Sequence, residues 1–147
     1  MASRVIAMRE IGLDDAEAVA RLSGELGYPA TADEMKRRIL HLQSARDHVV
    51  FVACSSDVVV AWIDVGIIHH LQAEPRGEIG GLVVSEGHRN RGIGRQLLAK
   101  AEEWARQQGM AEMQVRSRIT REDAHRFYRR EGYQQTKTSA VFSKPLA

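Results

Sequence analysis

Residues 78–98, EIGGLVVSEGHRNRGIGRQLL, are the part of the chain that most constrains its fold. The stretch begins as a β-forming run, continues through a basic turn that carries Gly92 and Gly94, and ends in an amphipathic helical pattern. The first backbone amides of a helix have no partner within the helix, and the helix dipole adds partial positive charge beside them. Three arginines around the turn add full charges: Arg89, Arg91 and Arg95. The stretch therefore predicts a strand–turn–helix unit that binds a phosphate group.

The length and composition predict one domain over residues 1–147. A chain of 147 residues can bury one hydrophobic core, and its content of 44% apolar and 27% charged residues is typical of a soluble globular protein. Apolar runs such as residues 58–63 are too short to cross a bilayer, and the N-terminal MASRVIAMRE lacks the apolar region of a secretory signal. The single cysteine, Cys54, fits a reducing compartment. We therefore expect a cytoplasmic protein without a membrane partner.

The N-terminal third is expected to contain one strand and two helices. Residues 4–8 are the predicted strand, and the Gly-Tyr-Pro sequence at residues 27–29 separates the two helices. The capping-box pattern that begins a helix occurs twice, at Asp14 with Glu17 and at Thr31 with Glu34.

A β region follows these helices. Residues 48–54 and 58–68 are apolar runs rich in β-branched residues, and the turn between them predicts an antiparallel hairpin. Residues 71–77 contain Pro75 and are expected to form a loop. In the strand after this loop, Gly80-Gly81 indicates a β-bulge or a place where a ligand approaches the backbone.

The C-terminal half alternates helices and strands. The helix after the basic turn should end at Gly109, and the next helix, which begins with Thr120 and Asp123, should end at Gly132. The predicted strands of this half are residues 110–116 and closing strands at Tyr133 and at residues 139–144. The whole chain predicts an α/β (α+β layered) fold in the order β-α-α-β-β-β-α-β-α-β, with a mixed, mostly antiparallel central sheet flanked by helices.

Three glycine-rich phosphate motifs can be compared with the basic turn. A P-loop requires Lys-Ser/Thr after its last glycine, but Arg95 and Gln96 follow Gly94. A Rossmann fingerprint requires glycine where this chain has Leu97. The pattern Arg/Gln-x-x-Gly-x-Gly/Ala, in contrast, matches residues 89–94.

On these residues the chain resembles the GNAT superfamily of N-acetyltransferases. The basic turn matches the acetyl-CoA pyrophosphate loop of that family, and residues 125–133, HRFYRREGY, match its second signature, a Phe-Tyr pair before a Gly-aromatic pair. The two motifs occur in the family order, and the predicted elements follow the family arrangement.

The resemblance implies a set of acetyl-CoA contacts. The loop residues would bind the pyrophosphate, and the preceding strand would pair with the pantetheine arm and direct an amide at the acetyl carbonyl. Ser117 stands where many members carry an asparagine that contacts pantetheine. The loop and strand residues are Arg89, Arg91, Gly92, Ile93, Gly94, Arg95, Leu82, Val83 and Val84.

The resemblance also implies two catalytic residues. Tyr128 aligns with the tyrosine that protonates the departing CoA thiolate, and a phenol is a suitable acid for that role. Glu78 lies on the strand where many members place a carboxylate that deprotonates the amine through water. The expected activity is transfer of an acetyl group from acetyl-CoA to a primary amine of a small molecule or peptide, by direct attack in a ternary complex.

Other functions remain open on the sequence alone. One alternative is a catalytically inactive acyl-CoA-binding sensor or partner module. Nucleic acid is not an expected partner, because the net charge is only +2 and aromatic residues make up only 5%. We expect no metal cofactor, because adjacent strand residues such as His69 and His70 point to opposite faces. Homodimers are common in the family.

Overall fold

The computed structural model describes residues 6–147, which form two compact units divided between Arg116 and Ser117. The first part of the strand predicted at residues 4–8 therefore lies outside the described residues.

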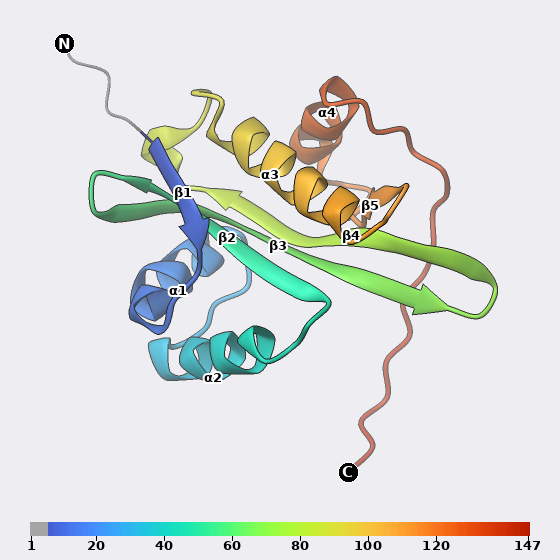
Figure 1. Cartoon of the computed structure of the whole chain (residues 1–147), viewed down its shortest axis with the longest axis horizontal. Coiled ribbons are helices and arrows are strands. Elements are labelled where there is room, and N and C mark those ends of the chain that lie inside the picture. Colours follow the sequence, from blue (N-terminus) through green and yellow to red (C-terminus); the bar gives the residue numbers. More distant parts are fainter. Residues whose placement is uncertain (1–5) are drawn as a thin grey trace. The chain divides into compact units, whose positions relative to one another are not determined.

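The first unit is built on a mixed sheet (Figure 1). Neighbouring strands follow the chain in the order β1-β2-β3-β4-β5, and all pairs are antiparallel except β4 with β5. This arrangement confirms the predicted fold class and the predicted hairpin of β2 and β3. The five strands of the described residues are β1 (Ile6–Glu10), β2 (His48–Ser55), β3 (Val58–His70), β4 (Ala73–Val84) and β5 (Met113–Val115).

Helices cover both faces of this sheet (Figure 1). On one face α1 (Ala16–Glu25) and α2 (Ala32–Gln43) pack on side chains that include Val52, Trp62 and Val83. On the other face α3 (Ile93–Gln107) packs on β2, β3 and β4 through its buried residues: Ile93, Leu97, Leu98, Ala101 and Ala105. Trp104 of the same helix is half-buried. Two short 3₁₀ turns, Leu13–Asp15 and Glu86–His88, precede α1 and α3.

Strand β4 is longer than predicted. It begins at Ala73, so most of the loop expected at residues 71–77 is strand. Pro75 is tolerated because β5 pairs with β4 only from Gly77 to Ile79, and the missing proline N–H therefore interrupts no ladder with β5. The strand predicted at residues 110–116 is shorter in the structure, because only residues 113–115 have a partner on β4.

The second unit contains α4 (Glu122–Arg130). Gly132, predicted to terminate this helix, follows it with a φ of +95°. The closing strands predicted at Tyr133 and residues 139–144 are wrong, because the described residues after Gly132 form no strand. Val141 and Phe142 are 83% and 93% exposed. Adjacent strand residues point to opposite faces, so this single apolar pair cannot supply the apolar face that a closing strand needs.

Two of the three predicted N-terminal helix caps, those at Asp14 and Thr120, are wrong. The Thr31 box is confirmed, because the Thr31 hydroxyl accepts from the Glu34 amide and the Glu34 carboxylate accepts from the Thr31 amide. The Asp14 box is not formed, since Asp15 occupies the cap position of α1 without a side-chain cap. The Thr120 box is not formed either, since Arg121 occupies the cap position of α4.

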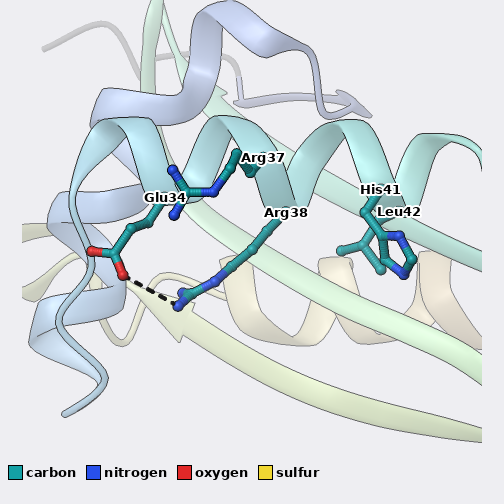
Figure 2. Close-up of a pocket in the computed structure, with 5 residues that line it drawn as sticks. All are labelled: Glu34, Arg37, Arg38, His41 and Leu42. Atoms are coloured by element: carbon teal, nitrogen blue, oxygen red, sulfur yellow. Dashed lines mark ion pairs between the residues drawn. The ribbon is translucent and has the colours of Figure 1, made fainter.

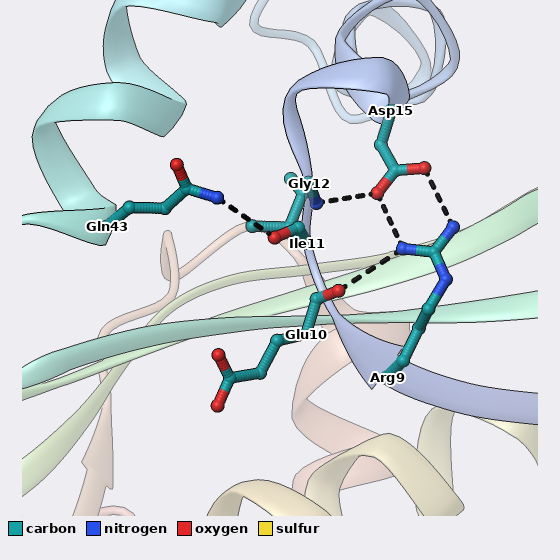
Figure 3. A network of polar contacts seen from close by, with 6 residues as sticks. All are labelled: Arg9, Glu10, Ile11, Gly12, Asp15 and Gln43. Carbon is teal, nitrogen blue, oxygen red and sulfur yellow. Dashed lines mark hydrogen bonds and ion pairs between the residues drawn. The ribbon is translucent and has the colours of Figure 1, made fainter.

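The Asp15 carboxylate instead joins β1 to the start of α1 (Figure 3). Its oxygens accept from both terminal nitrogens of Arg9 at 2.7 and 2.9 Å, and from the Gly12 amide at 2.8 Å. The Asp15 side chain is only 7% exposed, so the paired guanidinium compensates a buried charge. The Arg9 hydrogen bonds, and then the Gly12 amide, lower the pKa of Asp15.

We predict that Asp15→Asn destabilises the protein by about 2–3 kcal/mol at pH 7, because three hydrogen bonds to a charged acceptor are weakened. A lowered pKa makes this contribution fully present above the unfolded-state value near 3.9, and it is lost as the pH falls below that value. Urea unfolding of both proteins at pH 7 and pH 3 measures the difference. The exposed neighbour provides the control variant Asp14→Asn, and an equal Asp15→Asn effect at both pH values would contradict the charge argument.

Candidate active site

The loop between β4 and α3 is held in a defined conformation. Arg89 donates from Nε to the carbonyl of Val84, which closes the loop onto the end of the strand at 3.1 Å. Asn90 and Gly92 have φ values of +63° and +79°, in the left-handed region that favours Asn and Gly. The loop therefore turns sharply twice before α3 begins at Ile93.

The start of α3 presents unpaired backbone amides. Gly92 is the cap residue and has no side chain that could accept from them, and the first turn contains no acidic residue. The amides of Ile93 and Gly94 therefore lie at the positive end of the helix without an intrahelical partner. Arg91 and Gly92 are exposed beside them, whereas the Ile93 side chain is buried in the core. The structure thus brings the predicted loop residues together around one helix terminus.

The strand before this loop separates from its neighbour. β5 pairs with β4 up to Ile79, and among the described residues no strand pairs with β4 on that side from Gly80 to Val84. Gly80 is the extra residue of a β-bulge, since Asp64 lies opposite Gly81 and Val65 lies opposite Ile79. The backbone that includes Leu82 and Val84 therefore has a side available for hydrogen bonding to a ligand, which agrees with the bulge expected from the two glycines.

Glu78 lies on the face of the sheet that carries α1 and α2. Gly77 faces α3, since a Cβ there would lie 3.2 Å from Ala105, so its strand neighbour Glu78 points to the opposite face. Gln114 and Arg116 donate to Glu78 Oε1 at 2.7 and 3.1 Å, and Arg76 donates to Gln114. The carboxylate is thereby held in one orientation by residues on and beside β5.

A second polar pair lies on the same face. His48 of β2 and Asp64 of β3 are joined through His48 Nε2 and Asp64 Oδ1, and their side chains are 24% and 27% exposed. We call the whole group the polar cluster: His48, Asp64, Arg76, Glu78, Gln114 and Arg116. His48 and Asp64 were not predicted as site residues. Their signal was a polar residue at the start of one apolar strand and another within the strand predicted to pair with it.

Tyr128 and Ser117 belong to the second unit. The Tyr128 ring makes edge-on contacts with Phe127 and Tyr133, with ring centroids 5.1 and 5.6 Å apart. Burial raises the pKa of Tyr128 to about 12, so the phenol keeps its proton at neutral pH. The Ser117 hydroxyl is buried and has no hydrogen-bond partner within the described part of the chain.

A separate shallow hollow of about 400 Å³ lies along α2 (Figure 2). It is lined by Glu34, Arg37, Arg38, His41 and Leu42. None of the site residues predicted from the sequence lines it, so it is not part of the candidate active site. In residues 6–147 no three His, Cys, Asp or Glu side chains are grouped as a metal site would require, and no helix is long and apolar enough to span a bilayer.

Comparison with known proteins agrees with this geometry. Residues 16–133 match the model of the acetyltransferase (GNAT) family. Aminoalkylphosphonate N-acetyltransferase of Salmonella typhimurium is 41% identical over 117 residues, which cover 78% of this chain and 73% of that protein. Aminoglycoside N(6')-acetyltransferase type 1 of Stenotrophomonas maltophilia is 30% identical over 137 residues, which cover 90% of this chain and 88% of that protein.

The fold also matches solved structures. Aminoglycoside N-acetyltransferase AAC(6')-Iy in complex with CoA superposes with a TM-score of 0.87, at 18% identity and over 97% of both chains. The family match spans both units of the structure and includes the basic turn and Tyr128. The chain therefore belongs to the GNAT family of acetyltransferases and is an acetyl-CoA-dependent N-acetyltransferase.

Proposed function

We propose that this enzyme transfers an acetyl group from acetyl-CoA to a primary amine of a small molecule, by direct attack in a ternary complex. The observation that carries the proposal is the open side of β4 between the bulge at Gly80 and the start of α3. A thioester that pairs with this backbone would have its pyrophosphate at the helix terminus and its acetyl group near the bulge. In this proposal both units act as one domain over residues 1–147.

The donor would be held mainly by backbone groups. The amides of the loop from Arg91 to Arg95 would bind the pyrophosphate, with Arg89 fixing the loop on Val84. The segment from Leu82 to Val84 would pair with the pantetheine arm and direct one amide at the acetyl oxygen, where a preorganised donor is worth about 3 kcal/mol. The unpartnered Ser117 hydroxyl would gain a hydrogen bond from the same arm.

The reaction needs proton transfers at both ends. An alkyl ammonium with a pKa near ~10.4 must lose a proton before it can attack. Glu78, held through Oε1, would orient the ammonium and pass its proton on through water. Nitrogen would then bond to the acetyl carbon, the C–S bond would break, and the Tyr128 phenol would give its proton to the departing thiolate. The second proton lost from the nitrogen would restore the phenol through water.

The polar cluster favours an acceptor that carries both an amine and an anionic group. Carboxylates of Asp64 and Glu78 suit the ammonium, and the guanidiniums of Arg76 and Arg116 suit a phosphonate or carboxylate. The Salmonella relative is named for aminoalkylphosphonates, which combine these two groups. Aminoglycosides, which the Stenotrophomonas relative is named for, carry amines without the anion.

The direct experiment measures thiol release from acetyl-CoA with a panel of aminoalkylphosphonates, aminoglycosides, simple alkylamines and a peptide. We expect the fastest release with an aminoalkylphosphonate. If no amine raises release above background while CoA still raises the melting temperature, the protein is an acyl-CoA-binding module and the proposal is wrong.

We predict that Gly92→Leu weakens CoA binding at least tenfold, about 1.4 kcal/mol, because the side chain would project where the pyrophosphate binds. A Cβ at Gly92 meets only Gln96 Nε2, at 4.0 Å, so packing alone does not oppose the substitution. Calorimetric titration with CoA measures the affinity. Gly109→Leu introduces the same backbone strain, at a φ of +84°, at the other end of α3, and it should leave CoA affinity unchanged. Wild-type affinity in Gly92→Leu would contradict the loop assignment.

We predict that Tyr128→Phe lowers kcat by about 10²-fold or more and leaves the Kd for CoA within a factor of two or so, because the ring keeps its contacts and only the acid is lost. Steady-state kinetics with parallel CoA titration separates the two quantities. Tyr133→Phe, which removes a hydroxyl from the neighbouring ring, is the matched control. An unchanged kcat in Tyr128→Phe would make Tyr128 a packing residue.

A further inference from the structure

The pair of His48 and Asp64 is a built feature of the sheet face, because two glycines leave room for it. A Cβ at Gly66 would lie 2.5 Å from His48 Nδ1, and a Cβ at Gly80 would lie 2.5 Å from Asp64 Oδ2. Any other residue at either position would displace one member of the pair. The bulge that contributes Gly80 is the same one that opens β4 toward the donor.

Strand register places His48 in one row with Glu78. His48 lies opposite Gly66, Gly66 lies opposite Glu78, and Glu78 lies beside Gln114. Strands are about 4.8 Å apart, so His48 and Glu78 are separated by about 10 Å of sheet whose middle position has no side chain. The imidazole fills the near half of this gap, since Nδ1 lies over Gly66.

The hydrogen bond fixes the role of each ring nitrogen. A neutral imidazole that donates its Nε2 proton to Asp64 leaves Nδ1 as a proton acceptor. Nδ1 lies over Gly66, on the side of the ring that faces Glu78. Glu78 is the carboxylate proposed to orient the substrate ammonium.

We propose that His48 is the group that takes the proton from the acceptor ammonium, and that Asp64 is the positioning residue that fixes its tautomer. This inference rests on the proposed acetyl transfer. An N–H bond of the ammonium breaks, and the proton passes to His48 Nδ1 directly or through one water held by Glu78. The neutral amine attacks the thioester, the C–S bond breaks, and the thiolate takes the Tyr128 proton. The nitrogen, now bonded to the acetyl carbon, loses its second proton through water to the Tyr128 phenolate, and the imidazolium returns its proton to solvent.

The electrostatic surroundings support a base in this position. The hydrogen bond that His48 donates to Asp64 raises the pKa of His48 against the opposing effect of burial, and the charges of Asp64 and Asp47 raise it further. His69 forms an ion pair with Asp47 at 3.7 Å. Other charged groups on this face are Glu78 and Arg76 of β4, Arg116 just after β5, and Arg9 of β1, which is paired with Asp15.

The test is the pH dependence of kcat/KM in the full-length enzyme with an alkylamine acceptor. Wild-type activity should rise with pH as His48 loses its proton. His48→Gln should lose about 10²-fold or more and lose this limb of the profile. Asp64→Asn removes the group that raises the His48 pKa, so the limb should move to lower pH and the plateau should fall. His70→Gln, an exposed histidine on β3, is the matched control and should behave as wild type.

A second acceptor separates proton transfer from structure. An amine made less basic by fluorination is neutral at the assay pH and needs no base, so His48→Gln should lose much less activity with it than with the alkylamine. Equal losses with both amines, or an unchanged pH profile in His48→Gln and Asp64→Asn, would overturn the assignment.

CoA affinity and melting temperature verify that the variants fold. If His48→Gln does not fold, the shift of the pH limb in the near-isosteric Asp64→Asn decides. A wild-type enzyme that releases no thiol with any amine would overturn the proposed function itself, whereas an active wild type with an unchanged His48→Gln overturns only this inference.

Discussion

Strand β4 has a partner on both sides only from Gly77 to Ile79, and the arrangement of the site depends on how it continues alone. Its pairing with β5 ends at Ile79, next to the bulge at Gly80, and β3 remains its neighbour as far as Val84. A backbone that loses one partner must find other hydrogen bonds or water. Here the open stretch continues through the basic loop to the first amides of α3, and in the proposed complex this run of backbone donors and acceptors would face the donor substrate.

The same bulge also affects the part of the site where the acceptor amine would bind. Gly80 leaves the space that Asp64 Oδ2 occupies, and Asp64 holds His48 over Gly66. A single extra residue in β4 therefore serves both the backbone that would hold the thioester and the side chains that would receive the amine. Ile79 and Val83, which lie before and after the bulge on β4, are both buried, so the core holds the strand on each side of it.

Features that depend on residues close together in the sequence were predicted better than features that depend on how the strands pair. The strand–turn–helix unit around Gly92, the hairpin of β2 and β3, and the Thr31 cap depend on neighbouring residues, and they were predicted correctly. The Asp14 cap failed because a 3₁₀ turn occupies Leu13–Asp15, so Asp15 takes the cap position and its carboxylate pairs with Arg9 of β1. The link between His48 and Asp64 depends on the exact strand register, and a shift of one residue would place them on opposite faces.

This difference also explains why the sequence of such a chain predicts the donor substrate better than the acceptor substrate. The proposed donor contacts are mainly backbone groups, and their requirement for bare backbone leaves glycines at a fixed spacing in one short stretch. The proposed acceptor contacts are side chains of β2, β3, β4 and the segment beginning at β5, so no contiguous motif contains them. Substituting a side chain of the polar cluster changes the charges offered to the amine without altering the loop or the bulge. A family built in this way can keep one donor site while its members, such as those named for aminoalkylphosphonates and for aminoglycosides, use different acceptors.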